Sequence, residues 1–102
     1  DLSVETYDFK DFIVNADARD VIKNGKAVQL TEREFELTYL LAKNSGRTLS
    51  KEWLFEEIWG YDAELGIKTL AVFVRRVRCK IENDPDSPEH LQTVRVYGYK
   101  LV

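Results

Sequence analysis

The densest group of side chains able to recognise another molecule lies between residues 67 and 82. This stretch carries five basic residues and one acidic residue, although the whole chain has a net charge of −3 and a pI near 5.2. Its apolar residues recur at spacings of four, three and four, which predicts a helix with one core stripe: Leu70, Val74, Val77 and Ile81. At about 100° per residue, the opposite face carries Lys68, Val72, Arg75, Arg76 and Cys79.

A helix with one apolar face and one basic face fits the major groove of DNA, which is about 12 Å wide. Arginine suits a base edge because its planar fork donates two hydrogen bonds to guanine O6 and N7. Val72 on the same face is explained by contact with a thymine methyl group. The alternative interpretation is a basic helix face that contacts only water.

A second candidate surface is the C-terminal segment from residue 92 to residue 102, which predicts two strands around a turn near Tyr97 and Gly98. Arg95 at the tip of such a ribbon is suited to the negative potential of a narrow minor groove. Tyr99 is more typical of a core residue. Lys51 and the indole N–H of Trp59 are candidates for phosphate contacts, although packing is the simpler role for Trp59.

The composition argues against most other classes of protein. The single cysteine and the single histidine exclude a disulfide framework, a multi-cysteine zinc site and a zinc-protease motif. We find no glycine-rich phosphate loop, metal-ligand cluster or nucleophile elbow, so we expect no catalysis, no cofactor and no metal. No apolar run approaches the roughly 18 residues of a membrane span, and no signal peptide is visible. Because the chain lacks methionine and starts at Asp1, we expect a fragment or a processed form.

The elements that position these residues have clear local signals. Residues 1–30 read as short strands, with a hairpin turn at Asn24–Gly25. Thr31 and Glu34 predict a capping box for a first helix, which ends near Gly46. Ser50 predicts the cap of a second helix that runs to about Trp59, and the third helix spans 67–82. Strands, three helices and a ribbon in this order predict an α+β fold, a winged helix-turn-helix.

Five segments of the sequence resemble the OmpR/PhoB family of response-regulator effector domains. They are LTEREF (30–35), GRTLSKE (46–52), IWG (58–60), VRRVRCKI (74–81) and TVRVYGYKL (93–101). The resemblance implies one domain over 1–102: an N-terminal four-stranded antiparallel sheet (1–30), a three-helix core (31–82) and a β-hairpin wing (91–102). It implies a transcription regulator of a bacterial two-component system, located in the cytoplasm, whose receiver domain lies upstream and outside this chain.

The resemblance also implies roles for single residues. Arg76 and Val72 match positions that contact bases, and Lys68 lies on the same face. The positions that match phosphate contacts are Lys51, Trp59, Thr69, Arg75 and Arg78. Thr93 and Arg95 match contacts of the wing with the minor groove. The loop 60–66, with Tyr61, Asp62, Glu64 and Leu65, matches a segment that touches RNA polymerase in some members.

In the family, phosphorylation of the receiver promotes a homodimer, and two effector domains bind direct repeats of double-stranded DNA head to tail. The chain departs from the family pattern at Ala71, Phe73, Cys79 and Val96. Val96 replaces a common glycine of the wing. Because a β-branched residue resists positive φ, we expect the wing turn to differ in shape.

Two alternatives remain open from the sequence. A winged-helix scaffold can bind another protein through the third helix or through the loop 60–66, because a fold does not fix a function. The domain can also belong to a regulator without a receiver, including a membrane-anchored one that carries this effector domain first.

Overall fold

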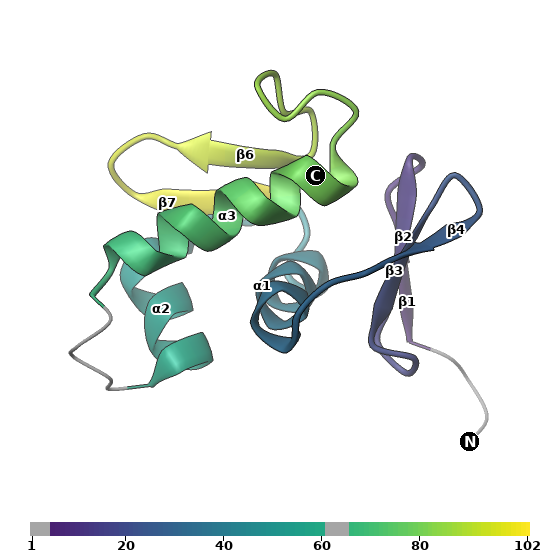
Figure 1. The fold of residues 1–102 in the computed structure, drawn as a ribbon. Helices are drawn as coiled ribbons and strands as arrows, with labels where there is room; N and C mark the ends of the chain where they lie inside the picture. Colours follow the sequence, from purple (N-terminus) through teal and green to yellow (C-terminus); the bar gives the residue numbers. More distant parts are fainter. Residues whose placement is uncertain (1–4, 61–65) are drawn as a thin grey trace.

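The predicted winged helix-turn-helix is confirmed by a computed structural model, which describes residues 5–60 and 66–102 (Figure 1). In chain order the elements are β1 (Thr6–Asp8), β2 (Phe12–Asn15), β3 (Asp20–Lys23), β4 (Lys26–Val28), α1 (Glu32–Lys43), β5 (Leu49–Ser50), α2 (Lys51–Trp59), α3 (Lys68–Ile81), β6 (Leu91–Val94) and β7 (Gly98–Leu101). No helix in the described ranges is long and apolar enough to cross a membrane.

The N-terminal strands form an antiparallel sheet in the order β1-β2-β3-β4. Asn24 and Gly25 connect β3 to β4 with φ values of 53° and 78°, as a type I′ turn requires. Phe12, Val14 and Val21 are buried and join the core that the helices share. Figure 1 shows α1 between this sheet and the rest of the molecule.

Both predicted helix caps are present. The Thr31 hydroxyl accepts a hydrogen bond from the Glu34 backbone N–H (3.3 Å), and the Glu34 carboxylate accepts one from the Thr31 N–H (3.0 Å). Ser50 caps α2 by accepting from the N–H of Trp53 at 3.1 Å. These side chains satisfy donors that have no partner inside the helix, so the first residues of α1 and α2 are fixed locally.

A two-residue strand that the sequence analysis did not predict ties α2 to the wing. β5 pairs with β7 in a second antiparallel sheet with the order β5-β7-β6. A Cβ atom on Gly98 would lie 1.9 Å from the carbonyl oxygen of Leu49, so only glycine permits this approach. The start of α2 is thereby held against the wing, the hairpin formed by β6 and β7.

The turn of the wing keeps a left-handed residue despite the substitution of valine for glycine. Val96 has φ +71° and is 85% exposed. Val96 thus adopts the positive φ that a β-branched residue resists. The turn is closed by a hydrogen bond from the Tyr97 N–H to the Val94 carbonyl (3.0 Å). The backbone of Val96 is strained in this turn.

We therefore predict that Val96→Gly stabilises the domain. Removal of the Cβ from a left-handed position relieves strain of about 1–3 kcal/mol, and the greater freedom of glycine in the unfolded chain returns about 0.5–1 kcal/mol of it. Urea denaturation should show a free energy of unfolding higher by about 1 kcal/mol. A decrease for Val96→Gly would show that the turn is not strained.

Candidate nucleic-acid interface

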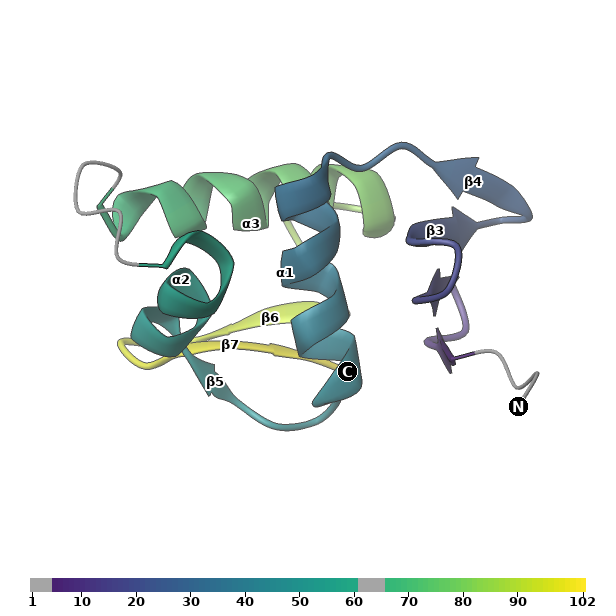
Figure 2. The ribbon, with the colours of Figure 1, turned by 90° about the horizontal axis from the view of Figure 1, so that it is seen from below.

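The orientation of α3 separates its residues as the apolar spacing predicts. The side chains of Leu70, Val74, Val77 and Ile81 are at most 1% exposed. On the opposite face Val72 is 49% exposed, and Arg75 and Arg76 are also exposed. Figure 2 shows α3 along one side of the molecule, with α2 next to its N-terminal part and the strands of the wing running in a similar direction. The exposed face of α3 therefore has two flanking elements that can contact the same ligand.

Arg76 lies on an aromatic surface that the sequence analysis did not identify. Its guanidinium carbon is 4.9 Å from the ring centroid of Phe73, and Phe73 meets Trp59 edge to face at 5.1 Å. Trp59 in turn stacks on Phe55 at 5.3 Å. The exposed cation thus rests on three packed rings, which restrict its rotamers. The i, i+3 spacing of Phe73 and Arg76 is the signal in the sequence that indicates this contact.

Arg78 joins α3 to the wing. Its Nε donates a hydrogen bond to the carbonyl of Leu91 (2.9 Å), and its Nη2 donates to the hydroxyl of Thr93 (2.7 Å). Burial lowers the pKa of Arg78, although a guanidinium stays charged at neutral pH. The structure therefore brings two of the predicted site residues together, and it gives Arg78 a role in holding the wing against α3.

Lys51 lies next to the same part of the wing. Its backbone N–H donates to the carbonyl of Tyr97 (3.1 Å), which fixes the first turn of α2 against the wing turn. A shallow hollow of about 120 Å³ is lined by Lys51, Thr93, Val94, Val96, Gly98 and Tyr99. Lys51, Thr93 and Arg78 therefore share one continuous surface.

Arg75 is engaged by the loop that follows α3. Its Nη1 lies 2.8 Å from a carboxylate oxygen of Asp86 and 3.4 Å from the carbonyl of Pro85. Both charged side chains are more than half exposed, so water screens the pair and its energy is small. Arg75 lies on the exposed face of α3, where a phosphate would compete with Asp86 for its guanidinium group.

We predict that Asp86→Asn increases DNA affinity by about two- to fivefold at low salt, the range expected for release of an exposed ion pair. The variant frees Arg75 and removes an acid from the interface. Asp17→Asn is the matched control, because Asp17 is exposed in the turn between β2 and β3. Equal affinities of the two variants in a fluorescence-anisotropy titration would show that Asp86 does not restrain Arg75.

A buried ion pair fixes α3 to α1. Lys80 Nζ lies 2.6 Å from a carboxylate oxygen of Glu34, which is only 2% exposed. Burial opposes ionisation of Glu34, but the hydrogen bonds from Lys80 and the Thr31 N–H outweigh it and hold the pKa of Glu34 below its ordinary value. One carboxylate thus caps α1 and anchors the helix that presents Arg76.

We predict that Glu34→Gln lowers the free energy of unfolding by about 1–2 kcal/mol near pH 7, because Lys80 loses its charged partner while remaining partly exposed. The folded-state pKa of Glu34 is depressed. Its stabilisation is therefore complete above the ordinary value of 4.5 and is lost as the pH falls through the folded-state pKa.

The free energies of unfolding of Glu34→Gln and of the parent protein should therefore become equal as the pH falls. Glu36→Gln is the matched control, since Glu36 forms only a surface pair with Arg33 at 3.5 Å and should change stability by less than about 0.5 kcal/mol. A constant difference between Glu34→Gln and the parent from pH 7 to pH 3 would contradict the assigned role of the carboxylate.

The remaining site residues stay predictions. Lys68 is exposed and Thr69 is half-buried in the first turn of α3, and Arg95 is exposed in the turn between β6 and β7. The residues predicted to contact a protein partner lie outside the described part of the chain: Tyr61, Asp62, Glu64 and Leu65.

Comparison with known families gives a match over residues 25–101. The matching family is described as "Transcriptional regulatory protein, C terminal". The matched range begins in the turn before β4 and ends with the last residue of β7. It therefore includes all three helices and both strands of the wing.

Solved structures of response regulators are similar over nearly the whole chain. The C-terminal effector domain of BfmR from Acinetobacter baumannii is 38% identical, with a TM-score of 0.83, over 100% of this chain and 94% of that one. DrrB, an OmpR/PhoB homologue from Thermotoga maritima, is 31% identical with a TM-score of 0.88, over 95% of this chain. This chain spans only 44% of DrrB.

A DNA complex is among the similar structures. The DNA-binding domain of RstA from Klebsiella pneumoniae, in complex with the RstA box, has a TM-score of 0.84 over 96% of this chain and 97% of that one. At 23% identity it supports the shared fold.

Proposed function

This chain belongs to the transcriptional regulatory protein C-terminal family, the OmpR/PhoB-type DNA-binding effector domains of two-component response regulators, and we propose how it reads its operator. In this proposal α3 lies in the major groove and the wing enters the adjacent minor groove. Phosphate contacts orient the domain, and base-edge contacts select the sequence.

The exposed pair of Val72 and Arg76 carries this proposal. The two residues are four positions apart, so they lie one above the other on the face of α3 opposite the buried stripe. An arginine held on an aromatic platform beside an exposed aliphatic side chain matches a guanine next to a thymine methyl group. Contact with water alone does not explain why Val72 is exposed on this face.

We assign the flanking residues to the DNA backbone. The residues proposed to contact phosphate are Lys51, Trp59, Lys68, Thr69, Arg75 and Arg78, and those proposed for the minor groove are Thr93 and Arg95. The hydrogen bond from Arg78 to Thr93 supports this assignment, because it brings a proposed phosphate contact next to a proposed minor-groove contact. We assign the phosphate contact of Trp59 to its indole N–H, since the ring stacks on Phe55 and meets Phe73 edge to face.

We predict opposite signatures for Arg76→Ala and Lys51→Ala on a duplex selected in vitro from a random pool. Arg76→Ala should weaken specific binding by about 1–3 kcal/mol and reduce discrimination against a mismatch at one position. Lys51→Ala should weaken all duplexes alike and reduce the slope of log affinity against log salt by about 0.9.

The selection and the two variants also separate the alternatives. An unchanged ratio of matched to mismatched affinity in Arg76→Ala would remove Arg76 from base recognition. An unchanged salt slope in Lys51→Ala would remove Lys51 from the phosphate contacts. Failure to enrich any duplex, together with recovery of a protein partner, would favour a protein-interaction module.

For the full-length protein we propose a receiver domain upstream of Asp1, since this chain spans 44% of DrrB. Phosphorylation of that receiver would favour a homodimer on direct repeats about one helical turn apart. We also propose that the segment 60–66, which joins α2 to α3, contacts RNA polymerase, and that the regulator acts in the bacterial cytoplasm.

A further inference from the structure

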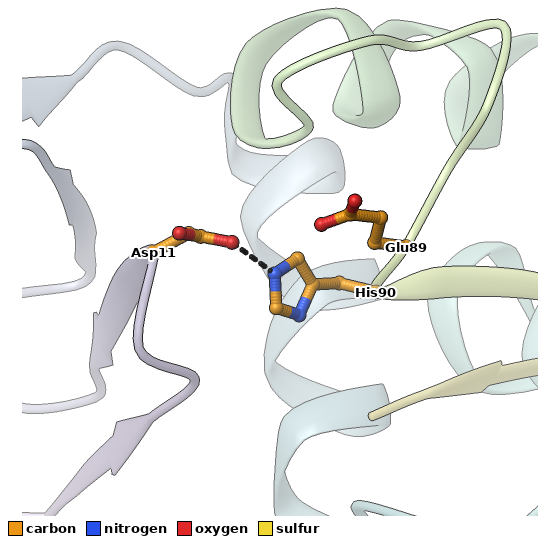
Figure 3. A group of neighbouring side chains, drawn as sticks. All are labelled: Asp11, Glu89 and His90. Carbon is orange, nitrogen blue, oxygen red and sulfur yellow. Dashed lines mark hydrogen bonds and ion pairs between the residues drawn. The ribbon is translucent and has the colours of Figure 1, made fainter.

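Three metal-ligating side chains from distant parts of the sequence meet on the side of the molecule where the N-terminal sheet approaches the wing. Asp11 lies in the turn before β2, and Glu89 and His90 directly precede β6 (Figure 3). Each can offer one nitrogen or oxygen ligand, and these three atoms lie within 4.8 Å of one another. The cluster has no part in the proposed DNA interface.

His90 is oriented with its Nε2 toward the Asp11 carboxylate. Its Nδ1 lies 2.7 Å from the carbonyl oxygen of Val102, and a carbonyl oxygen only accepts, so Nδ1 carries a proton and donates. Nε2 lies 2.8 Å from a carboxylate oxygen of Asp11. This distance is that of a hydrogen bond from a protonated ring, and in the neutral ring the same Nε2 carries a lone pair that a metal ion can take when the two groups move slightly apart.

The second carboxylate favours a divalent ion over a single proton. Glu89 is exposed, so water solvates its carboxylate when a proton is shared by His90 and Asp11, whereas a divalent ion bound to all three side chains would neutralise both carboxylates. The Nδ1–H bond to a backbone carbonyl is also the outer contact that orients a metal-binding histidine through Nε2.

The backbone around the cluster is held in place by a buried carboxylate. Glu82 is 3% exposed, and its oxygens accept hydrogen bonds from the N–H groups of Glu89, His90 and Leu91 at 2.6–3.2 Å. The His90 ring also packs edge to face on Phe12 at 4.9 Å. Glu89 and His90 therefore come from a segment whose backbone is already fixed. Binding of a metal ion requires only rotation of the Asp11 and Glu89 side chains.

We propose that Asp11, Glu89 and His90 form a binding site for a divalent transition-metal ion of the Zn²⁺ type, which links the N-terminal sheet to the wing. One imidazole nitrogen and two carboxylate oxygens are suitable ligands for Zn²⁺, with a water molecule in the fourth position. Tetrahedral bonds of about 2.0–2.2 Å place neighbouring ligand atoms about 3.3 Å apart, which small side-chain rotations can reach.

The test uses the only histidine of the chain as its reporter. Titration of Zn²⁺ into the Cys79→Ser domain, which lacks the exposed thiol, should shift the Nε2 resonance of His90 with a stoichiometry of one. The melting temperature should rise with Zn²⁺ concentration and return after addition of EDTA. Mg²⁺ at the same concentration should leave the resonance unchanged, because it prefers six oxygen ligands.

The matched variants are Glu89→Gln and Glu52→Gln in the same background. Glu89 is exposed and only its backbone groups take part in the hydrogen bonds around Glu82 and Gln92, so its side chain can be changed without loss of the fold. Glu89→Gln should weaken Zn²⁺ binding by at least about tenfold, the lower range for loss of a supporting group around a metal. Glu52→Gln, an exposed acid in α2, should bind Zn²⁺ as the parent does.

Two results would overturn the proposal. The first is a His90 imidazole that stays doubly protonated on both nitrogens in excess Zn²⁺, which would show that a proton occupies the position between Nε2 and Asp11. The second is equal Zn²⁺ affinity in Glu89→Gln and the parent, which would show that Glu89 is not a ligand. Neither result depends on DNA binding, so the proposed function is tested separately.

Discussion

The rotation of α3 about its own axis is the constraint on which the interface depends. Burial of one aliphatic side chain contributes about 1.5–3 kcal/mol, and four such side chains line the stripe from Leu70 to Ile81. A turn of the helix that moved Arg76 away from solvent would bring this stripe into water. The ion pair of Lys80 with buried Glu34 adds a polar contact at the C-terminal end. The proposed recognition of bases by Arg76 would therefore rely on packing inside the domain.

The basic residues of α3 serve the fold as well as the interface. Lys80 pairs with Glu34, Arg78 bonds the wing, and Arg75 is shared with Asp86. Lys80 and Arg75 thus have acidic partners inside the domain, whereas Arg78 is bonded to neutral groups and keeps its full charge. The contacts of Arg78 fix the wing relative to α3, so this residue holds together the two elements that we propose contact DNA.

The features that could be predicted from the sequence are those whose residues lie close together along the chain. The caps at Thr31 and Ser50 involve residues three positions apart, and the stripe of α3 repeats within one helix, so both could be predicted. The contact of Arg78 with Thr93 spans 15 residues and that of His90 with Asp11 spans 79, and no spacing rule indicates either. β5 has only two residues, too few for an alternating pattern. The missed features are thus the ones that tertiary packing creates.

The shortage of free positive charge bears on how such a domain occupies DNA. Each phosphate contact contributes to affinity through the release of counterions, and this domain has an overall charge of −3. Of the residues proposed to contact phosphate, Arg75 is paired with Asp86 and Arg78 is hydrogen-bonded to the wing, so both already have partners inside one copy. A second copy joined to the first binds at a high effective concentration and doubles these contacts without a change in the domain. The proposed binding of two linked copies to direct repeats would in this way add phosphate contacts that the internal bonds of Arg75 and Arg78 restrict in a single copy.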